Sequence, residues 1–198
     1  MNSTPLAERM RPQNLDEYIG QEHLVGNGAV LRKTIASGNN PSIIFWGPPG
    51  VGKTTLAQII AKELKRPFYI LSAINSGVKE IREVIEKSQS KGLFNNSSIL
   101  FIDEIHRFSK SQQDSLLGAV EKGTVTLIGA TTENPSFEVI PALLSRCQIY
   151  VLKSFGKDDL IQLLNKAMEK DNKLKEKKIQ IHEYEALLRL CGGDARKL

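Results

Sequence analysis

The sequence predicts an α/β protein with a five-stranded parallel sheet flanked by helices, followed by the start of a small all-helical unit. Five short apolar runs have the length and composition of buried strands, at residues 42–46, 68–71, 99–102, 125–129 and 149–152. Amphipathic stretches with helical spacing separate these runs. Strands that alternate with helices indicate a parallel sheet with right-handed crossovers.

The crossover helices are predicted from their apolar stripes and caps. One helix is expected over residues 53–64, directly after the first strand. Apolar residues recur at helical spacing within 78–85 after the second strand and within 116–120 after the third. Ser109 and Gln112 form a capping box ahead of the third crossover helix, which indicates where that helix begins.

Before the first strand we expect an N-terminal helical segment, residues 1–40, that packs on the core. Asn14 and Glu17 have the spacing of a capping box, and Gly20 is placed to stop a first short helix. A second helix is expected over residues 29–37, ending at Gly38, with Pro41 just beyond. The core domain is assigned to residues 41–154.

From residue 155 onwards the strand pattern ends, and residues 155–198 are expected to form part of a helical lid. Helices are predicted over 158–168 and 182–191, and Gly192 and Gly193 end the second. Asp194 has the character of an N-cap whose helix is cut off at residue 198. We therefore expect the chain to end inside its second domain.

Composition predicts a soluble, cytoplasmic protein. Of the 198 residues, 40% are hydrophobic and 25% are charged, which is typical of globular domains. Residues 1–11 lack the apolar centre of a signal peptide, and no apolar run approaches the roughly 18 residues of a membrane span. Cys147 and Cys191 lack the spacing of a zinc site or a disulfide scaffold, which fits a reducing compartment.

The chain is basic, and its net charge of +5 and pI near 9.2 suit a nucleic-acid partner. Much of the excess lies in residues 166–178, where six Lys accompany Glu169, Asp171 and Glu176. Runs of this kind are usually solvated connections. The net charge therefore does not by itself locate a DNA contact.

A phosphate loop is predicted at residues 47–54, which match GxxxxGK[ST] between a predicted strand and a predicted helix. Glycines let backbone N–H groups close around phosphate oxygens, and the helix N-terminus adds its positive end. Lys53 would hold the β- and γ-phosphates of ATP, and the Thr54 hydroxyl would bind Mg²⁺. The predicted nucleotide contacts here are Gly47, Pro48, Pro49, Gly50, Val51, Gly52, Lys53, Thr54 and Thr55.

Two carboxylates follow the third predicted strand and supply the partner that such a loop needs. Asp103 ends the strand and can hold the magnesium ion through water, and Glu104 can orient and polarise the attacking water. An Asp-Glu pair is often only a solvated surface feature, but this one directly follows a buried strand and lies 50 residues after Lys53. The sequence therefore predicts a magnesium-dependent ATP hydrolase.

Two further motifs extend the predicted site. Thr132 follows the fourth strand, which in the usual order of such ATPases inserts between the first and the third, so that its tip faces the γ-phosphate. Thr131 and Asn134 stand behind it as candidates, and an ordinary capped turn is the alternative. Arg146, before the last strand, is by default a surface arginine, but it lies at the predicted subunit edge.

These motifs occur in the order found in AAA+ ATPases. The triplet Ser145-Arg146-Cys147 and the opening at residues 11–21 resemble clamp-loader subunits. Narrower similarity, at residues 5–12, 76–82, 103–114 and 129–137, is to the bacterial RarA (also MgsA) family of replication-associated recombination proteins, which is related to the eukaryotic Werner-helicase-interacting ATPase. The resemblance covers essentially the whole chain.

The resemblance implies roles that spacing alone does not give. Arg146 resembles the arginine finger, which completes the ATP site of a neighbouring subunit, and Arg196 resembles the second sensor of its own site. Tyr18, Ile19 and Gly20 resemble the adenine-side pocket. Members are homo-oligomeric, DNA-dependent ATPases of replication forks and recombination, which implies DNA, single-strand-binding protein or other replication proteins as partners, at the bacterial nucleoid. Their oligomerising C-terminal domains are expected to be missing from this chain.

DNA contact is predicted on the helix after the second strand, which faces the central pore in clamp-loader relatives. Lys79 and Arg82 lie three residues apart on one face of this helix, and such cations suffice for contacts with phosphates. The alternative is a solvated helix face, since Glu80 and Glu83 alternate with them.

The leading functional hypothesis is a DNA-dependent AAA+ ATPase in replication-fork maintenance, recombination and repair. A Holliday-junction branch-migration motor or a clamp-loader subunit stays open, because residues 103–107 also resemble such motors. A small-molecule kinase built on the same loop would need a substrate pocket in place of Arg146 and Arg196. His23, His106 and His182 are scattered, and none is predicted to be a metal ligand or a general base.

Overall fold

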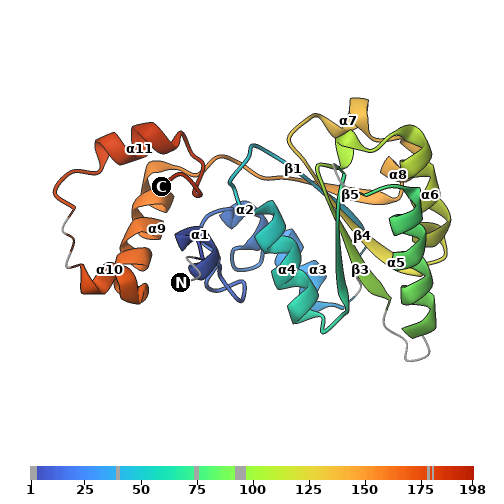
Figure 1. Cartoon of the computed structure of the whole chain (residues 1–198), viewed down its shortest axis with the longest axis horizontal. Coiled ribbons are helices and arrows are strands. Elements are labelled where there is room, and N and C mark those ends of the chain that lie inside the picture. Colours follow the sequence, from blue (N-terminus) through green and yellow to red (C-terminus); the bar gives the residue numbers. More distant parts are fainter. Residues whose placement is uncertain (1–3, 39–40, 74–75, 92–96, 178, 180) are drawn as a thin grey trace.

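The computed structural model describes residues 4–38, 41–73, 76–91, 97–177, 179 and 181–198. Its centre is a five-stranded parallel sheet in the order β2-β3-β4-β1-β5 (Figure 1). The strands are β1 Ser42–Trp46, β2 Phe68–Ser72, β3 Ser98–Asp103, β4 Val125–Thr131 and β5 Cys147–Val151. The predicted fold class is confirmed, as is the insertion of the fourth strand between the first and the third.

Helices cover both faces of the sheet, because successive side chains of a strand point to opposite faces. Ile43 and Phe45 of β1 join the core on the side of α3 and α4, whereas Ile44 joins the core on the side of α5, α6 and α8. The predicted capping box of Ser109 and Gln112 is present at the start of α6. These helices are α3 Val30–Ala36, α4 Lys53–Glu63, α5 Val78–Lys91, α6 Lys110–Glu121 and α8 Pro141–Leu144, with α7 Pro135–Glu138 preceding α8.

The N-terminal segment corrects one prediction. It contains α1 Leu6–Arg9, α2 Glu22–Val25 and α3, and the helix predicted between Asn14 and Gly20 is wrong. The Asn14 side chain does accept the Glu17 N–H at 2.9 Å, but the Glu17 carboxylate bonds the N–H of Gln13 and not that of Asn14. The capping box is therefore incomplete, and residues 13–17 form bends instead of a helix. The helix predicted over 29–37 is present as α3, one residue shorter at each end.

After β5 the chain leaves the sheet and forms helices that gather at one end of the molecule, on the left in Figure 1. They are α9 Lys157–Lys170, α10 Asn172–Glu176 and α11 Glu185–Cys191. The helix predicted over 182–191 begins later than expected, at Glu185, and the hydroxyl of Tyr184 just before it donates to Asn165 of α9. Residues 194–198 contain no helix, so the helix expected after Asp194 is not present.

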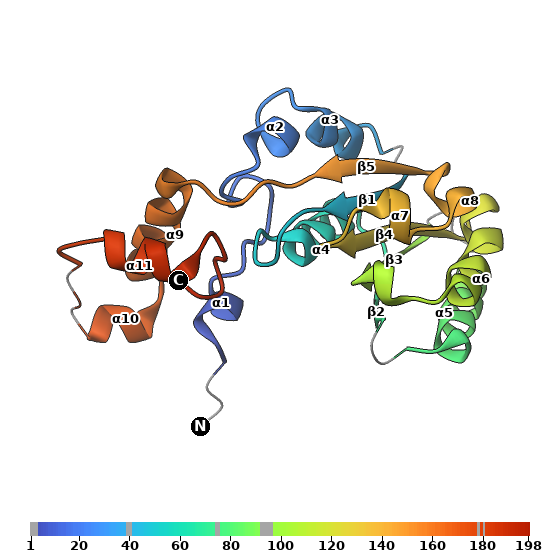
Figure 2. The same cartoon turned by 90° about the horizontal axis from the view of Figure 1, so that it is seen from above.

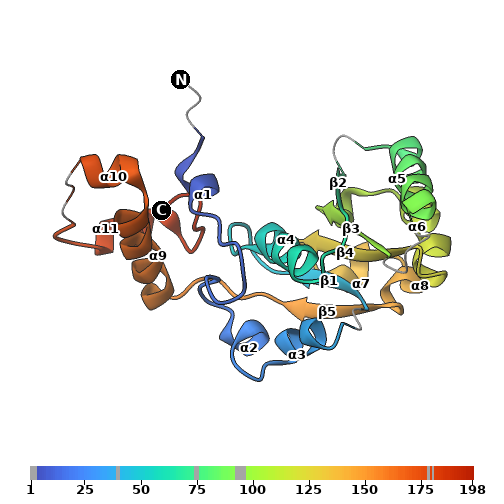
Figure 3. The same cartoon turned by 90° about the horizontal axis from the view of Figure 1, so that it is seen from below.

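The N-terminal segment bridges the sheet and these last helices, and Figures 2 and 3 show its helices α2 and α3 beside β5. Arg9 pairs with Asp171 through two hydrogen bonds, of 2.6 and 3.0 Å. The Gln21 side chain donates to the carbonyl of Lys153 at 2.7 Å and accepts its N–H at 2.9 Å. These contacts hold the C-terminal end of α9, and the connection that precedes this helix, against residues 9–21.

Candidate active site

The carboxyl ends of β1, β3 and β4 meet at one edge of the sheet, and the predicted loop, carboxylates and threonine all follow these strands. Trp46 pairs with Thr131 across β1 and β4, and the Gly47 N–H donates to the Thr131 carbonyl at 3.1 Å. In open α/β sheets, ligands bind outside the carboxyl ends of the strands. The topology therefore brings the predicted site together.

The loop between β1 and α4 has a backbone that depends on its glycines. Gly50 and Gly52 have φ values of 74° and 93°, in the left-handed region that residues with a Cβ rarely adopt. A Cβ on Gly47 would lie 2.3 Å from the carbonyl oxygen of Leu152. Val51 is completely buried and anchors the loop. Of the other loop residues, Pro49 is exposed, and Pro48, Thr54 and Thr55 are half-buried.

Lys53 begins α4 and folds its side chain back under the loop. Its Nζ donates to the carbonyl oxygens of Gly47 and Pro48, at 2.6 and 2.8 Å, and the residue is 7% exposed. Burial lowers the pKa of Lys53, and the charges of Glu104 and Asp103 oppose this effect. The loop thus holds a cation at its base, beside two carboxylates.

The two carboxylates have different surroundings. Burial raises the pKa of Asp103, the charge of Glu104 adds to this effect, and Lys53 opposes it. Glu104 has φ 55° and ψ 49°, a left-handed conformation that is uncommon for residues with a side chain. The Thr132 hydroxyl donates to Glu104 Oε2 over a long 3.5 Å, and His106 Nε2 lies 3.3 Å from the same oxygen.

The chain after α11 returns to the loop. The Ala195 N–H donates to the Gly50 carbonyl at 3.3 Å, and a Cβ on Gly50 would lie 1.8 Å from Asp194 Oδ1. Arg196 pairs with Asp194, Nη2 to Oδ2, at 2.8 Å. The Arg196 charge also lowers the pKa of Lys53 and of Asp103, so it lies within electrostatic reach of the site.

Arg146 lies at the opposite edge of the sheet from the loop. The next residue, Cys147, pairs with Ser42 at the start of β1, while the loop follows the end of β1. With about 3.3 Å per strand residue, this separation is roughly the length of the strand. Arg146 is exposed and forms an ion pair of 2.5 Å with Glu121 at the end of α6. It therefore does not take part in the site of its own chain.

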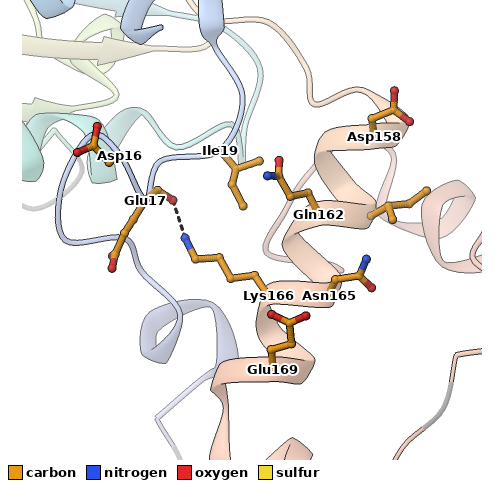
Figure 4. A pocket seen from close by; sticks show the side chains of 9 residues that line it. Asp16, Glu17, Ile19, Asp158, Gln162, Asn165, Lys166 and Glu169 are labelled. Atoms are coloured by element: carbon orange, nitrogen blue, oxygen red, sulfur yellow. Dashed lines mark hydrogen bonds between the residues drawn. The ribbon is translucent and has the colours of Figure 1, made fainter. Parts of the chain in front are cut away.

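The residues predicted for the adenine side lie between the loop and α9. Tyr18 is buried beneath the loop and donates its hydroxyl to the Val51 carbonyl at 3.1 Å. Gly20, with φ 78°, is packed against the ring of Phe155. Ile19 lines a pocket of about 550 Å³ between residues 16–19 and α9. Figure 4 shows Ile19 facing the Gln162 side chain of α9. Below them, Lys166 Nζ donates to the Glu17 carbonyl oxygen at 2.7 Å and so joins the two sides of the pocket.

The predicted DNA contacts, Lys79 and Arg82, are both exposed on the first turns of α5. Ile81 between them is completely buried, so this helix presents its apolar side to the sheet and its charged side outwards. Glu80 accepts the N–H of Gly77 at 2.8 Å, and Glu80 and Glu83 are exposed beside the two cations, so this face carries charges of both signs. Of the basic run at residues 166–178, only residue 178 lies outside the described residues.

The donor groups fit a nucleotide with a magnesium ion. Mg²⁺ prefers oxygen ligands and usually takes one or two from the protein and the rest from phosphates and water. Thr54 and Asp103 offer a hydroxyl and a carboxylate at this edge. In the part of the chain that the structure describes, no group of three or more His, Cys, Asp and Glu could hold a metal on its own. The two-oxygen donor set is the kind that a nucleotide-bound ion needs.

Sequence reasoning did not find three contacts made by the predicted functional residues. His106 reaches Glu104, Asp194 covers Gly50, and Glu121 pairs with Arg146. The first had a local signal, because a tight turn after Glu104 brings a residue two positions later back towards it. The other two join segments far apart in the sequence, and one chain alone carries no signal for them.

Residues 43–155 match the ATPase family associated with various cellular activities (AAA), and the chain belongs to this family. It is 50% identical over 195 residues to replication-associated recombination protein A of Haemophilus influenzae and 49% identical over 196 residues to the protein of that name in Escherichia coli K12. These matches cover 97% and 98% of the chain but 44% of each relative. The chain thus spans less than half the length of these curated relatives.

Other relatives extend the comparison. The chain is 46% identical to the ATPase WRNIP1 of Dictyostelium discoideum, with 97% of this chain and 22% of that protein covered. The structure of the Thermotoga maritima RuvB Holliday junction branch migration motor aligns with a TM-score of 0.74 and 28% identity, covering 95% of this chain and 62% of that one. The predicted resemblance to the RarA family is confirmed. Among the described residues, no helix has the length and apolar character needed to cross a membrane.

Proposed function

We propose that this chain binds ATP with Mg²⁺ at the carboxyl edge of β1, β3 and β4 and hydrolyses it. The observation that carries the proposal is the convergence of a glycine-dependent loop, the buried cation of Lys53 and the carboxylates of Asp103 and Glu104 at this edge. When bound, the ion would neutralise charge on the phosphates. Thr54 and Asp103 are the residues that would hold it.

Each residue of the site has a proposed role. The loop N–H groups and the start of α4 bind the phosphates, and Lys53 supplies a fixed positive charge. Glu104 accepts a proton from the attacking water, and Thr132 orients the γ-phosphate side. Arg196 supplies a second positive charge from the lid. Tyr18, Ile19 and Gly20 form the adenine side. The proposed domains are an N-terminal segment of residues 1–40, an ATPase core of residues 41–154 and a partial lid of residues 155–198.

Arg146 is proposed to act on a neighbouring copy. Its position at the opposite edge of the sheet, exposed and away from Lys53, supports a role in trans. An arginine finger stabilises transition-state charge and contributes about 10³–10⁵ in rate. A head-to-tail contact of this kind requires an oligomer with a heterologous interface. We therefore propose that the whole protein is a homo-oligomer with composite ATP sites.

We propose further that DNA stimulates the ATPase and that the protein acts in replication-associated recombination and repair. The relatives named replication-associated recombination protein A support this biological setting. Lys79 and Arg82, both exposed on α5, are the proposed backbone contacts. Their cations recognise phosphates whatever the base sequence.

The test is the ATPase rate of the whole protein without DNA and with single-stranded, double-stranded, gapped and forked DNA. We expect at least one of these to raise kcat. An unchanged rate with all four contradicts the DNA-dependent part of the proposal. The second candidate is a branch-migration motor, which the structural likeness to RuvB favours. Movement of a synthetic four-way junction by the whole protein would support that candidate.

A further inference from the structure

The side chain of His106 lies between the two strand ends that build the site. Its Nε2 is 3.3 Å from Oε2 of Glu104, and its Nδ1 is 3.0 Å from the hydroxyl of Thr131, the last residue of β4. The side chain is 12% exposed. One imidazole ring thus connects the residue after β3 with the end of β4.

The backbone that carries His106 is fixed on both sides. Residues Ile105–Arg107 form a 3₁₀ turn directly after the left-handed Glu104. Ile105 is completely buried and Phe108 is 3% exposed. A Cβ on Gly129 of β4 would lie 3.1 Å from Ile105 Cδ1, so the missing side chain of Gly129 makes room for this anchor. The ring is therefore held in place by packing that does not involve the ring itself.

The hydrogen on Nε2 follows from its neighbour, because an ionised carboxylate can only accept a hydrogen bond. A neutral imidazole carries one N–H. If Nε2–H donates to the Glu104 carboxylate, Nδ1 must accept from the hydroxyl of Thr131. That hydroxyl has a second possible acceptor, the carbonyl of Glu133 at 3.1 Å, and it accepts the Glu133 N–H at 3.0 Å. In this arrangement Thr131 donates to Nδ1, and the N–H at Nε2 faces Oε2 of Glu104 at 3.3 Å.

Both polar side chains that contact the Glu104 carboxylate approach the same oxygen. The Thr132 hydroxyl and His106 Nε2 both approach Oε2, and among the described residues no hydrogen bond to Oε1 is present. One carboxylate oxygen is held, and the other remains able to accept a hydrogen bond from water. A general base needs such geometry, because it must lie within hydrogen-bond reach of the proton that it accepts.

We propose that His106 is a positioning residue, which holds Oε2 of Glu104 so that Oε1 faces the attacking water. The inference rests on the proposed function, in which Glu104 is the base. His106 touches no substrate; it acts through Glu104. Its loss should therefore lower kcat and leave the affinity for ATP unchanged, since the phosphate loop and Lys53 are untouched.

The experiment compares His106→Gln, His106→Asn and His106→Ala in the whole protein. The amide nitrogen of Gln reaches the position of Nε2, whereas that of Asn reaches only the position of Nδ1 and stops short of Glu104. We measure kcat, KM and the Kd of a non-hydrolysable ATP analogue. Losing one preorganised hydrogen bond at a reacting group lowers kcat by up to about 10²–10³, and for a residue that acts through another we expect about 10- to 100-fold for Ala and Asn.

His106→Gln should keep kcat within about threefold of the natural protein, and all three variants should keep the Kd within about threefold. His182→Gln, at an exposed histidine, is the matched control. A second variant, Thr131→Val, keeps the ring and removes the hydroxyl that contacts Nδ1 of His106 and the backbone of Glu133, and it should lower kcat in the same direction. It keeps the test decisive if His106→Ala does not fold.

Normal kcat in both His106→Ala and Thr131→Val overturns the proposal, as does a Gln variant as slow as the Asn variant. Glu104→Gln separates this failure from failure of the proposed function. If Glu104→Gln abolishes turnover while His106→Ala is normal, only the positioning role is wrong. If Glu104→Gln turns over normally, the role of Glu104 itself is wrong. In the Glu104→Gln background, His106→Ala should cause no further loss, because the two act as one unit.

Discussion

Replacing Gly50 by Ala tests the contact between the phosphate loop and the chain after α11. Gly50 has φ 74°, and a Cβ there would lie 1.8 Å from Oδ1, 2.1 Å from Cγ and 2.8 Å from Cα of Asp194. Part of this contact is with backbone, so a side-chain rotation cannot relieve it. Residues 194–195 must withdraw, which breaks the 3.3 Å hydrogen bond from the Ala195 N–H to the Gly50 carbonyl.

The expected loss of stability has two parts. An Ala held at positive φ costs about 1–2 kcal/mol. Overpacking a closely packed contact adds about 1–3 kcal/mol. Gly123→Ala is the matched control, because Gly123 has φ 67° and nothing lies within 4 Å of its Cβ position. Gly123→Ala should therefore lose only the first part, about 1–2 kcal/mol, and Gly50→Ala about 2–5 kcal/mol in all.

Urea unfolding followed by the fluorescence of Trp46, the single tryptophan, measures both variants. Trp46 ends β1 directly before the loop, so its emission reports on this region. In the Gly50→Ala background, Asp194→Ala removes two of the three close contacts and should cost less than it does alone. Equal losses in Gly50→Ala and Gly123→Ala, with Asp194→Ala additive, would show that the loop and Asp194 are not in contact.

Three further predictions follow from other contacts. Asp171→Asn should lower stability near neutral pH and have no effect below the folded-state pKa of Asp171. The hydrogen bond from Arg9 lowers that pKa, so the stabilisation by Asp171 is present above about pH 4 and is lost as the pH falls through the lowered pKa. Acid unfolding of both proteins measures this difference. Replacing Lys79 and Arg82 by Ala should flatten the salt dependence of DNA binding by about two units of slope; an unchanged slope points to the basic run at 166–178. Arg146→Ala should abolish turnover, and mixing it with Glu104→Gln should restore part of it; wild-type turnover by Arg146→Ala alone excludes the arginine finger.

The sheet was predictable because its determinants are local. A run such as residues 99–102 is apolar at every position, which indicates a strand buried on both faces. The conformation of the loop at residues 47–54 was predictable for a related reason, since φ above zero at Gly50 and Gly52 demands glycine and the pattern of glycines is visible in the sequence. The strand order came from the usual order of such ATPases, and the structure confirms it.

The errors and omissions lie where distant contacts decide the local structure. The residues at 14–20 carry a helix-start pattern, but Leu15 and Tyr18 pack into the core with α3 and α4, and the segment forms bends. The helix expected at 182–191 begins only at Glu185, where the preceding Tyr184 contacts Asn165 of α9, 19 residues earlier. The position of Asp194 over Gly50 depends on how the last residues fold back across the sheet edge, which periodicity cannot reveal.

The central claim is that the edge formed by β1, β3 and β4 binds and hydrolyses ATP. It is tested most directly by titrating a fluorescent ATP analogue into the Lys53→Ala and Glu104→Gln forms of the whole protein and measuring phosphate release from ATP in the same samples. Lys53→Ala should lose binding, because the phosphates lose their fixed counter-charge. Glu104→Gln should bind normally but turn over about 10²–10⁴ times more slowly. Tight binding by Lys53→Ala, or normal phosphate release by Glu104→Gln, would contradict the claim.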